Sequence, residues 1–104
     1  MTGKRKAKTD TRKDKIKYFL DHMQDINPDA LYPTDMKDAI IGYVERAGMS
    51  PQILLDREKC IDCLVKGGIK VRDDAEEFFE YNTIGSFMGK EVTPCFATLI
   101  QDIK

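Results

Sequence analysis

The sequence predicts a mainly helical α+β domain, with about four helices packed on a small two-stranded sheet. Three observations support this fold class. Apolar residues recur at helical spacing in four segments, and two short apolar runs, residues 52–55 and 94–100, are typical of buried strands. Proline and glycine separate these segments. The 104 residues suffice for one core, so we expect a single domain over residues 12–104 after a disordered basic arm, residues 1–11.

The first two helices follow from apolar stripes. One stripe has the i, i+3, i+4, i+7 spacing of a helix face and consists of Ile16, Phe19, Leu20 and Met23. Proline disfavours a helical conformation in the residue before it, so Asn27-Pro28-Asp29 ends this helix. We expect the second helix over residues 35–47, with Thr34 as its N-cap and Gly48 as the left-handed residue after its end.

Cap and turn residues indicate the remaining helices. Asp56 is the expected N-cap of a third helix, which ends at Gly67-Gly68. Asp73 and Glu76 have capping-box spacing and predict a fourth helix over residues 74–88. The two predicted strands pair most economically with each other, and the helices must pack on them because an isolated two-stranded ribbon is marginally stable.

The charge is divided unevenly along the chain. The net charge is −1, but residues 1–17 carry eight basic and two acidic side chains, which leaves the rest of the chain at −7. A basic arm on an acidic body is one pattern of nucleic-acid-binding proteins, and it is also typical of a solvated tail. The candidate nucleic-acid-binding residues are Lys4, Arg5, Lys6, Lys8, Arg12, Lys13, Lys15 and Lys17.

The cysteines allow three interpretations. Cys60 and Cys63 form a CxxC pair, which occurs in redox proteins at a helix N-terminus, but here Cys60 falls about one turn inside the predicted helix. A metal site would need Cys60, Cys63, Cys95 and His22 to converge. The interpretation that we favour is that Cys60 and Cys95 are small core residues and that His22 is a surface residue without a partner.

The fourth predicted helix carries the candidate partner-binding residues. Asn82 lies near the centre of its apolar stripe, so we expect a buried amide that either clamps a neighbouring backbone or lies in a partner-binding groove. Acidic side chains gather at the start of this helix, either as a solvated face or as a surface for a basic partner: Asp73, Asp74, Glu76, Glu77 and Glu80.

Several function classes lack support in the sequence. No apolar run approaches the roughly 20 residues that span a bilayer, and no apolar segment follows the basic N-terminus as in a secretory signal. An odd number of cysteines argues for a reduced, cytoplasmic setting. Nucleophile-elbow, GxGxxG and Walker motifs are absent. We therefore predict no catalytic site and no cofactor.

Ordered blocks of the sequence resemble a known family. These blocks are DALYP (residues 29–33), DAIIG (38–42), DREKCI (56–61), DAEEFFEYNTIG (74–85) and TPCF (93–96). The set, spanning about residues 29–97, resembles small uncharacterised proteins of bacteriophages and prophages. The resemblance implies an accessory phage-type protein of the host cytoplasm, and such proteins often bind host machinery, including defence systems.

Together these observations predict a non-enzymatic binding module that acts on a host or phage protein. The alternative is a nucleic-acid-binding protein that uses the basic arm. A homodimer is a further alternative, because the second and fourth predicted helices carry more apolar surface than a two-stranded sheet covers.

Overall fold

The computed structural model describes residues 12–86 and 88–103. Its elements, in chain order, are helix α2 (Arg12–Ile26), the 3-10 helix η1 (Thr34–Ala39), strands β1 (Ile40–Arg46) and β2 (Met49–Asp56), helices α3 (Arg57–Lys66) and α4 (Arg72–Phe78), the π-helical turn η2 (Phe79–Thr83), strand β3 (Cys95–Ala97) and the 3-10 helix η3 (Ile100–Asp102). The predicted mainly helical α+β class is confirmed, but the sheet has three strands rather than two.

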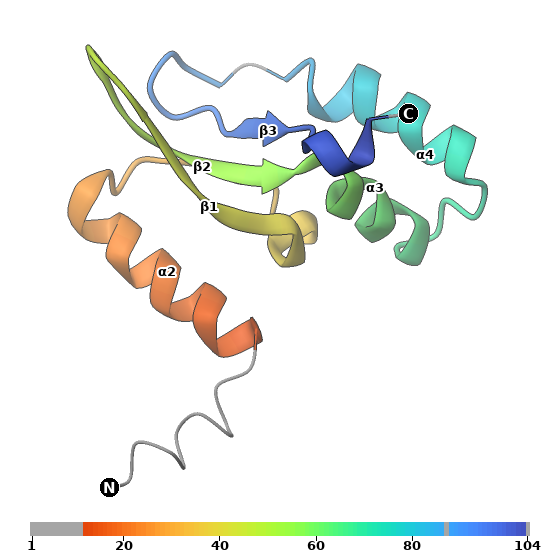
Figure 1. Ribbon diagram of the computed structural model, residues 1–104, viewed down its shortest axis with the longest axis horizontal. Coiled ribbons are helices and arrows are strands. Elements are labelled where there is room, and N and C mark those ends of the chain that lie inside the picture. The colour runs from red at the N-terminus through yellow and green to blue at the C-terminus, as the bar shows by residue number, and fades with distance from the viewer. Residues whose placement is uncertain (1–11, 87, 104) are drawn as a thin grey trace, which may run out of the picture.

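The sheet has the strand order β1-β2-β3, with β1 antiparallel and β3 parallel to the central strand β2. The register sets Leu54 opposite Cys95 and Leu55 opposite Phe96. This confirms that the two predicted strands pair with each other, but the second is shorter than the predicted range 94–100: only Cys95–Ala97 is a strand, and Ile100–Asp102 is a 3-10 helix. In Figure 1 the long β1–β2 hairpin runs away from α3 and α4, and α2 lies beneath the strands.

The predicted second helix, residues 35–47, is wrong. Only Thr34–Ala39 is helical, as a 3-10 turn, and Ile40–Arg46 is strand β1. The run Ile40-Ile41-Gly42-Tyr43-Val44 is rich in the β-branched and aromatic residues that pack well on a pleated surface, and β2 supplies its partner. Gly48 has the expected left-handed conformation, with φ +82°, but there it forms the turn of the β1–β2 hairpin.

The third helix has the predicted ends. The Asp56 carboxylate accepts a hydrogen bond from Glu58 N at 3.1 Å. At the other end Ile69 N donates to Leu64 O at 3.1 Å, a Schellman-type closure made possible by Gly68 at φ +130°.

The fourth helix is shorter than the predicted range 74–88, and it has no capping box. Val71 is the N-cap residue and makes no side-chain cap. Asp73 lies in the first turn, where a carboxylate still interacts favourably with the helix dipole. The helix continues as the π-helical turn η2 and ends at Thr83.

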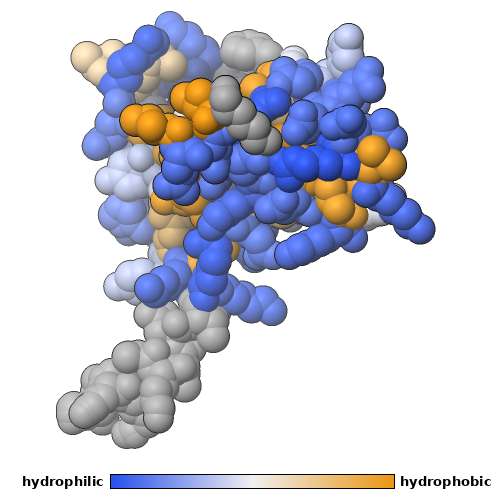
Figure 2. Space-filling model, turned by 45° about the vertical axis from the view of Figure 1, so that its right-hand side comes forward, coloured by the Kyte–Doolittle hydropathy of each residue, from blue (hydrophilic) through white to orange (hydrophobic). Residues whose placement is uncertain are grey.

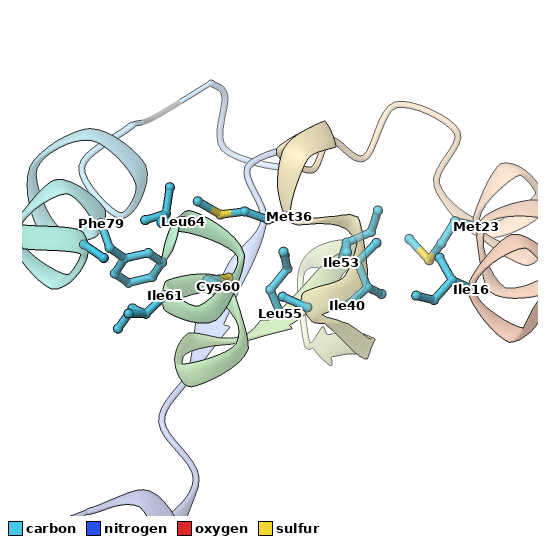
Figure 3. Close-up of a cluster of buried hydrophobic side chains, with 12 residues drawn as sticks. Ile16, Met23, Met36, Ile40, Ile53, Leu55, Cys60, Ile61, Leu64 and Phe79 are labelled. Carbon is cyan, nitrogen blue, oxygen red and sulfur yellow. The ribbon is translucent and has the colours of Figure 1, made fainter. Parts of the chain in front are cut away.

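One hydrophobic core joins these elements, with the exception of η3, which contributes no buried residue. Figure 3 shows a continuous row of side chains that runs from α2, through the strands, to α3 and α4. Ile16 and Met23 hold α2 on one side of the strands, and Phe79 anchors α4 at the far end. The core positions residues 33–36, 78–86, 88 and 94–96, which contain the lining of the candidate site.

Candidate partner-binding cleft

The acidic residues predicted at the start of the fourth helix do not form one uniform surface. Asp73, Asp74 and Glu77 are exposed, and within the described residues they make no ion pair. The other two members of the set, Glu76 and Glu80, are each paired with an arginine. Two of the five predicted carboxylates are therefore used in ion pairs within the protein, and the other three can interact with a partner.

Arg72 binds three carboxylates, two of which join α4 to α3. Its Nη1 donates to Asp62 Oδ1 at 3.2 Å and its Nη2 to Glu58, both on α3, whereas its Nε donates to Glu76 Oε2 at 3.3 Å within α4. The predicted site residue Glu76 is thus paired, at i, i+4 spacing, with the arginine that links the two helices.

Arg57 holds Glu80 in the same way and also covers an aromatic ring. Arg57 Nη2 lies 2.5 Å from Glu80 Oε2, and its guanidinium lies 5.0 Å from the centre of the Phe79 ring. The fully buried Phe79 ring in turn meets Phe96 edge-on, with the ring centres 5.2 Å apart. These contacts fix the position of Phe96, which lines the cleft described below.

The amide expected to be buried at Asn82 is exposed, so that prediction is wrong. The reason is that the π-helical turn begins at Phe79 and ends the regular 3.6-residue spacing that placed Asn82 on the inner face. The buried amide is Asn27, which is 8% exposed. Its Nδ2 donates to Pro51 O at 2.8 Å and to Glu91 O at 3.0 Å.

Asn82 instead lines a cleft of about 220 Å³ between η1, the α4–η2 segment and the start of β3. The lining residues are Pro33, Asp35, Met36, Phe78, Asn82, Thr83, Ser86, Met88, Pro94 and Phe96. Met36 is almost fully buried and Phe96 is partly buried, whereas Phe78 and Met88 are 42% and 54% exposed. The cleft is therefore apolar inside, with polar side chains along one edge.

The polar edge and the Met88 wall are held by local hydrogen bonds. Ser86 Oγ donates to Asn82 O at 2.9 Å. Thr93 Oγ1 accepts from Met88 N at 2.9 Å and donates to Gly89 O at 2.7 Å. The side-chain amide of Asn82 makes no hydrogen bond within the described part of the chain, so its donor and acceptor are available to a ligand.

None of the three cysteines lines this cleft. Cys60 is fully buried, and burial raises its thiol pKa from 9.0 to about 12, which opposes a reactive thiolate. Burial also raises the pKa of Cys63. Cys95 Sγ donates to Gln52 Oε1 at 3.4 Å, and its partly buried side chain lies in the sheet. Among the described residues no group of three or more His, Cys, Asp and Glu side chains could hold a metal ion.

His22 is exposed, as expected, but it has a neighbour. Its ring centre lies 5.9 Å from that of Tyr43 on β1, and Phe19 stacks near the same tyrosine at 6.3 Å. The predicted partnerless histidine therefore contributes to the contact between α2 and the hairpin.

The predicted nucleic-acid-binding residues fall into three groups. Lys4, Arg5, Lys6 and Lys8, with the predicted disordered arm 1–11, lie outside the described residues. Lys13, Lys15 and Lys17 are exposed on α2. Arg12 has a structural contact, because its Nη2 donates to Asp38 O at 2.8 Å and to Ile40 O at 2.5 Å, where η1 passes into β1.

Comparison of the chain with family models, curated proteins and solved structures found no significant match. The resemblance to phage proteins therefore stays a prediction. Within the described residues, no helix is long and apolar enough to cross a membrane.

Proposed function

We propose that this protein is a non-enzymatic binding module that takes a segment of a protein partner into the cleft between η1, α4–η2 and β3. The observation that carries the proposal is the exposed apolar wall of this cleft. Phe78 and Met88 leave large apolar areas in contact with water, beside a preformed hollow. Exposed apolar surface next to a concave site is typical of interaction sites.

The size of the cleft favours a protein segment over a small-molecule substrate. Pockets for small molecules usually measure about 300–1,000 Å³, whereas this cleft holds about 220 Å³. A volume of this size takes one large side chain, in the way that interface anchors fill pockets on a partner. The chemistry of the lining agrees, since Asp35 is the one charged residue among the described lining residues.

The face of the molecule drawn in Figure 2 is mainly hydrophilic, with separate apolar patches. Tyr18 on α2 is 80% exposed but does not line the cleft, so it provides a matched control for an exposed aromatic ring. The phage resemblance adds the expectation that the partner is a host or phage protein, for example a component of host defence or regulation.

The test is selection of a displayed random-peptide library on the purified protein. We expect enriched peptides whose affinity falls by at least about tenfold with Phe78→Asp or Met88→Asp, because filling an apolar pocket with a large side chain is worth more than about 1.4 kcal/mol. Tyr18→Ser should leave the affinity unchanged. The proposal is refuted if no peptide is enriched, or if the enriched peptides bind the folded Phe78→Asp and Met88→Asp variants as tightly as the original protein.

A further inference from the structure

The carboxylates around the cleft indicate what kind of segment it binds. We infer, on the basis of the proposed function, that the partner segment carries a large apolar side chain with a lysine or arginine next to it in space. The apolar side chain enters the cleft, and the cation lies between Asp35 and Asp74 at the rim.

The first step of the argument is the ridge on α4. Asp74 and Phe78 are four residues apart in α4, so they lie on one side of this helix. Phe78 and Asn82 both line the cleft. Asp74 is therefore the acidic residue of the first turn that lies nearest to the cleft wall, whereas Asp73 is rotated away from it by about 100°.

The second step is that these carboxylates are available. Asp35 is exposed and lines the opposite wall, on η1. Neither Asp35 nor Asp74 forms an ion pair with another described residue. In contrast, Glu76 and Glu80 face arginines and are already neutralised. Two unpaired carboxylates thus lie at or near the apolar cleft: Asp35 lines it, and Asp74 lies one helical turn before the lining residue Phe78.

The third step is the rigidity of the site. Phe96 packs edge-on against the buried Phe79 ring, and the backbone of Met88 and Gly89 is held by hydrogen bonds with Thr93 Oγ1. Because the pocket is preformed, little free energy is lost in ordering its residues when a ligand binds. The Asn82 amide has both a donor and an acceptor, so it can pair with the backbone of an extended peptide beside the anchor side chain.

Charge complementarity favours a basic partner segment over a second copy of the chain as the occupant of the cleft. The chain has a net charge of −1, and the cleft lies in its acidic part, so two clefts facing each other would bring Asp35 and Asp74 near their own copies. Like charges at close range oppose such an arrangement.

The experiment uses synthetic peptides that share one central phenylalanine, flanked by lysine, serine or glutamate. We expect the lysine-flanked peptide to bind most tightly and the glutamate-flanked peptide least tightly, with the difference shrinking at high salt. Asp74→Asn and Asp35→Asn should each weaken the lysine-flanked peptide by up to about fivefold, the range of exposed ion pairs. Asp73→Asn is the matched control, since it removes the same charge from the same helical turn, and it should have no effect.

Two results overturn the inference. One is equal binding of the three peptides by a protein whose binding still depends on Phe78; in that case the cleft binds protein segments but does not select for charge, and only the inference fails. The other is self-association in analytical ultracentrifugation that is abolished by Phe78→Asp, which identifies a second copy as the occupant. Loss of all peptide binding at the cleft would instead refute the proposed function itself.

Discussion

Replacing Asn27 with alanine tests how the fold holds the loop that carries the cleft wall. The Asn27 side chain lies just after the end of α2, and its Nδ2 reaches Pro51 O on β2 and Glu91 O in the loop before β3. Three segments that are far apart in the sequence therefore meet at one buried amide. Alanine removes both hydrogen bonds and leaves two backbone carbonyls without this donor.

The magnitude follows from the two bonds. Each hydrogen bond contributes a net of about 0.5–1.5 kcal/mol, so the substitution should cost about 1–3 kcal/mol of the free energy of unfolding. For a domain of about 100 residues, a loss of about 2 kcal/mol lowers the melting temperature by roughly 8–16 °C. The same substitution at the exposed Asn82 should change the free energy of unfolding by less than about 0.5 kcal/mol.

Thermal unfolding followed by far-ultraviolet circular dichroism measures both variants. Asn27→Asp distinguishes the effect of losing the hydrogen bonds from the effect of losing side-chain volume. Aspartate has the size of asparagine, but at neutral pH it has no donor for the two carbonyls. We expect Asn27→Asp to be at least as destabilising as Asn27→Ala. The reasoning is refuted if Asn82→Ala destabilises the protein more than Asn27→Ala, or if Asn27→Asp melts at the original temperature.

Two further predictions concern α3. Asp56→Ala removes the N-cap of α3 and should lower the free energy of unfolding, measured by urea denaturation, by about 1 kcal/mol. Asp56→Asn keeps a cap acceptor and should lower it clearly less. Equal losses for the two variants would contradict the assigned cap. Because burial raises the pKa of Cys60 to about 12, its folded thiol stays protonated while the unfolded thiol ionises above about pH 9, so this residue makes stability fall as pH rises from about 9 to 12. Cys60→Ala should reduce that alkaline fall. In a protein with Cys63 and Cys95 replaced by serine, Ellman's reagent should modify Cys60 only as the protein unfolds, and rapid modification of the folded protein would show that the thiol is accessible.

The elements with strong local signals could be predicted from the sequence. Asp56 and Gly67-Gly68 bracket α3 with residues that have specific roles at helix ends, and both ends are confirmed. The apolar run Ile53–Leu55 has β-branched and aliphatic residues between turn signals, and it forms the central strand. In these segments local preference and tertiary environment agree.

The segment after Thr34 shows why other elements could not be predicted. Met36, Ile40 and Tyr43 satisfy a helical spacing, but the same residues also fit a 3-10 turn followed by a strand. The choice depends on β2, which offers a hydrogen-bonding edge to β1, and no local pattern records that pairing. The pairing of β1 with β2 therefore determines the structure of this segment, in spite of the helical spacing of its apolar residues.

Only one wall of the cleft could be reached from the pattern of the fourth helix. Its charge run and apolar spacing drew attention to Asn82, which lines the cleft, and to Asp74, which lies one helical turn before the lining residue Phe78. The opposite wall, at Asp35 and Met36, comes from a segment about 40 residues earlier, so a single helical pattern could not reveal it. The pairing of Glu80 with Arg57 likewise depends on the packing of α3 against the α4–η2 segment, whereas the Arg72–Glu76 pair has i, i+4 spacing within α4.

Asn27 and Asn82 together separate the stability of the fold from the proposed binding. Asn27 does not line the cleft, but it holds Glu91, three residues beyond Met88, so its loss should loosen the Met88 wall and weaken peptide binding together with stability. Asn82 lines the cleft and makes no side-chain hydrogen bond within the described residues, so its loss should weaken binding alone. If instead both substitutions changed binding and stability in parallel, the cleft would be a by-product of packing rather than a binding site. The contrast between these two amides is therefore the sharpest test of whether the cleft has a function of its own.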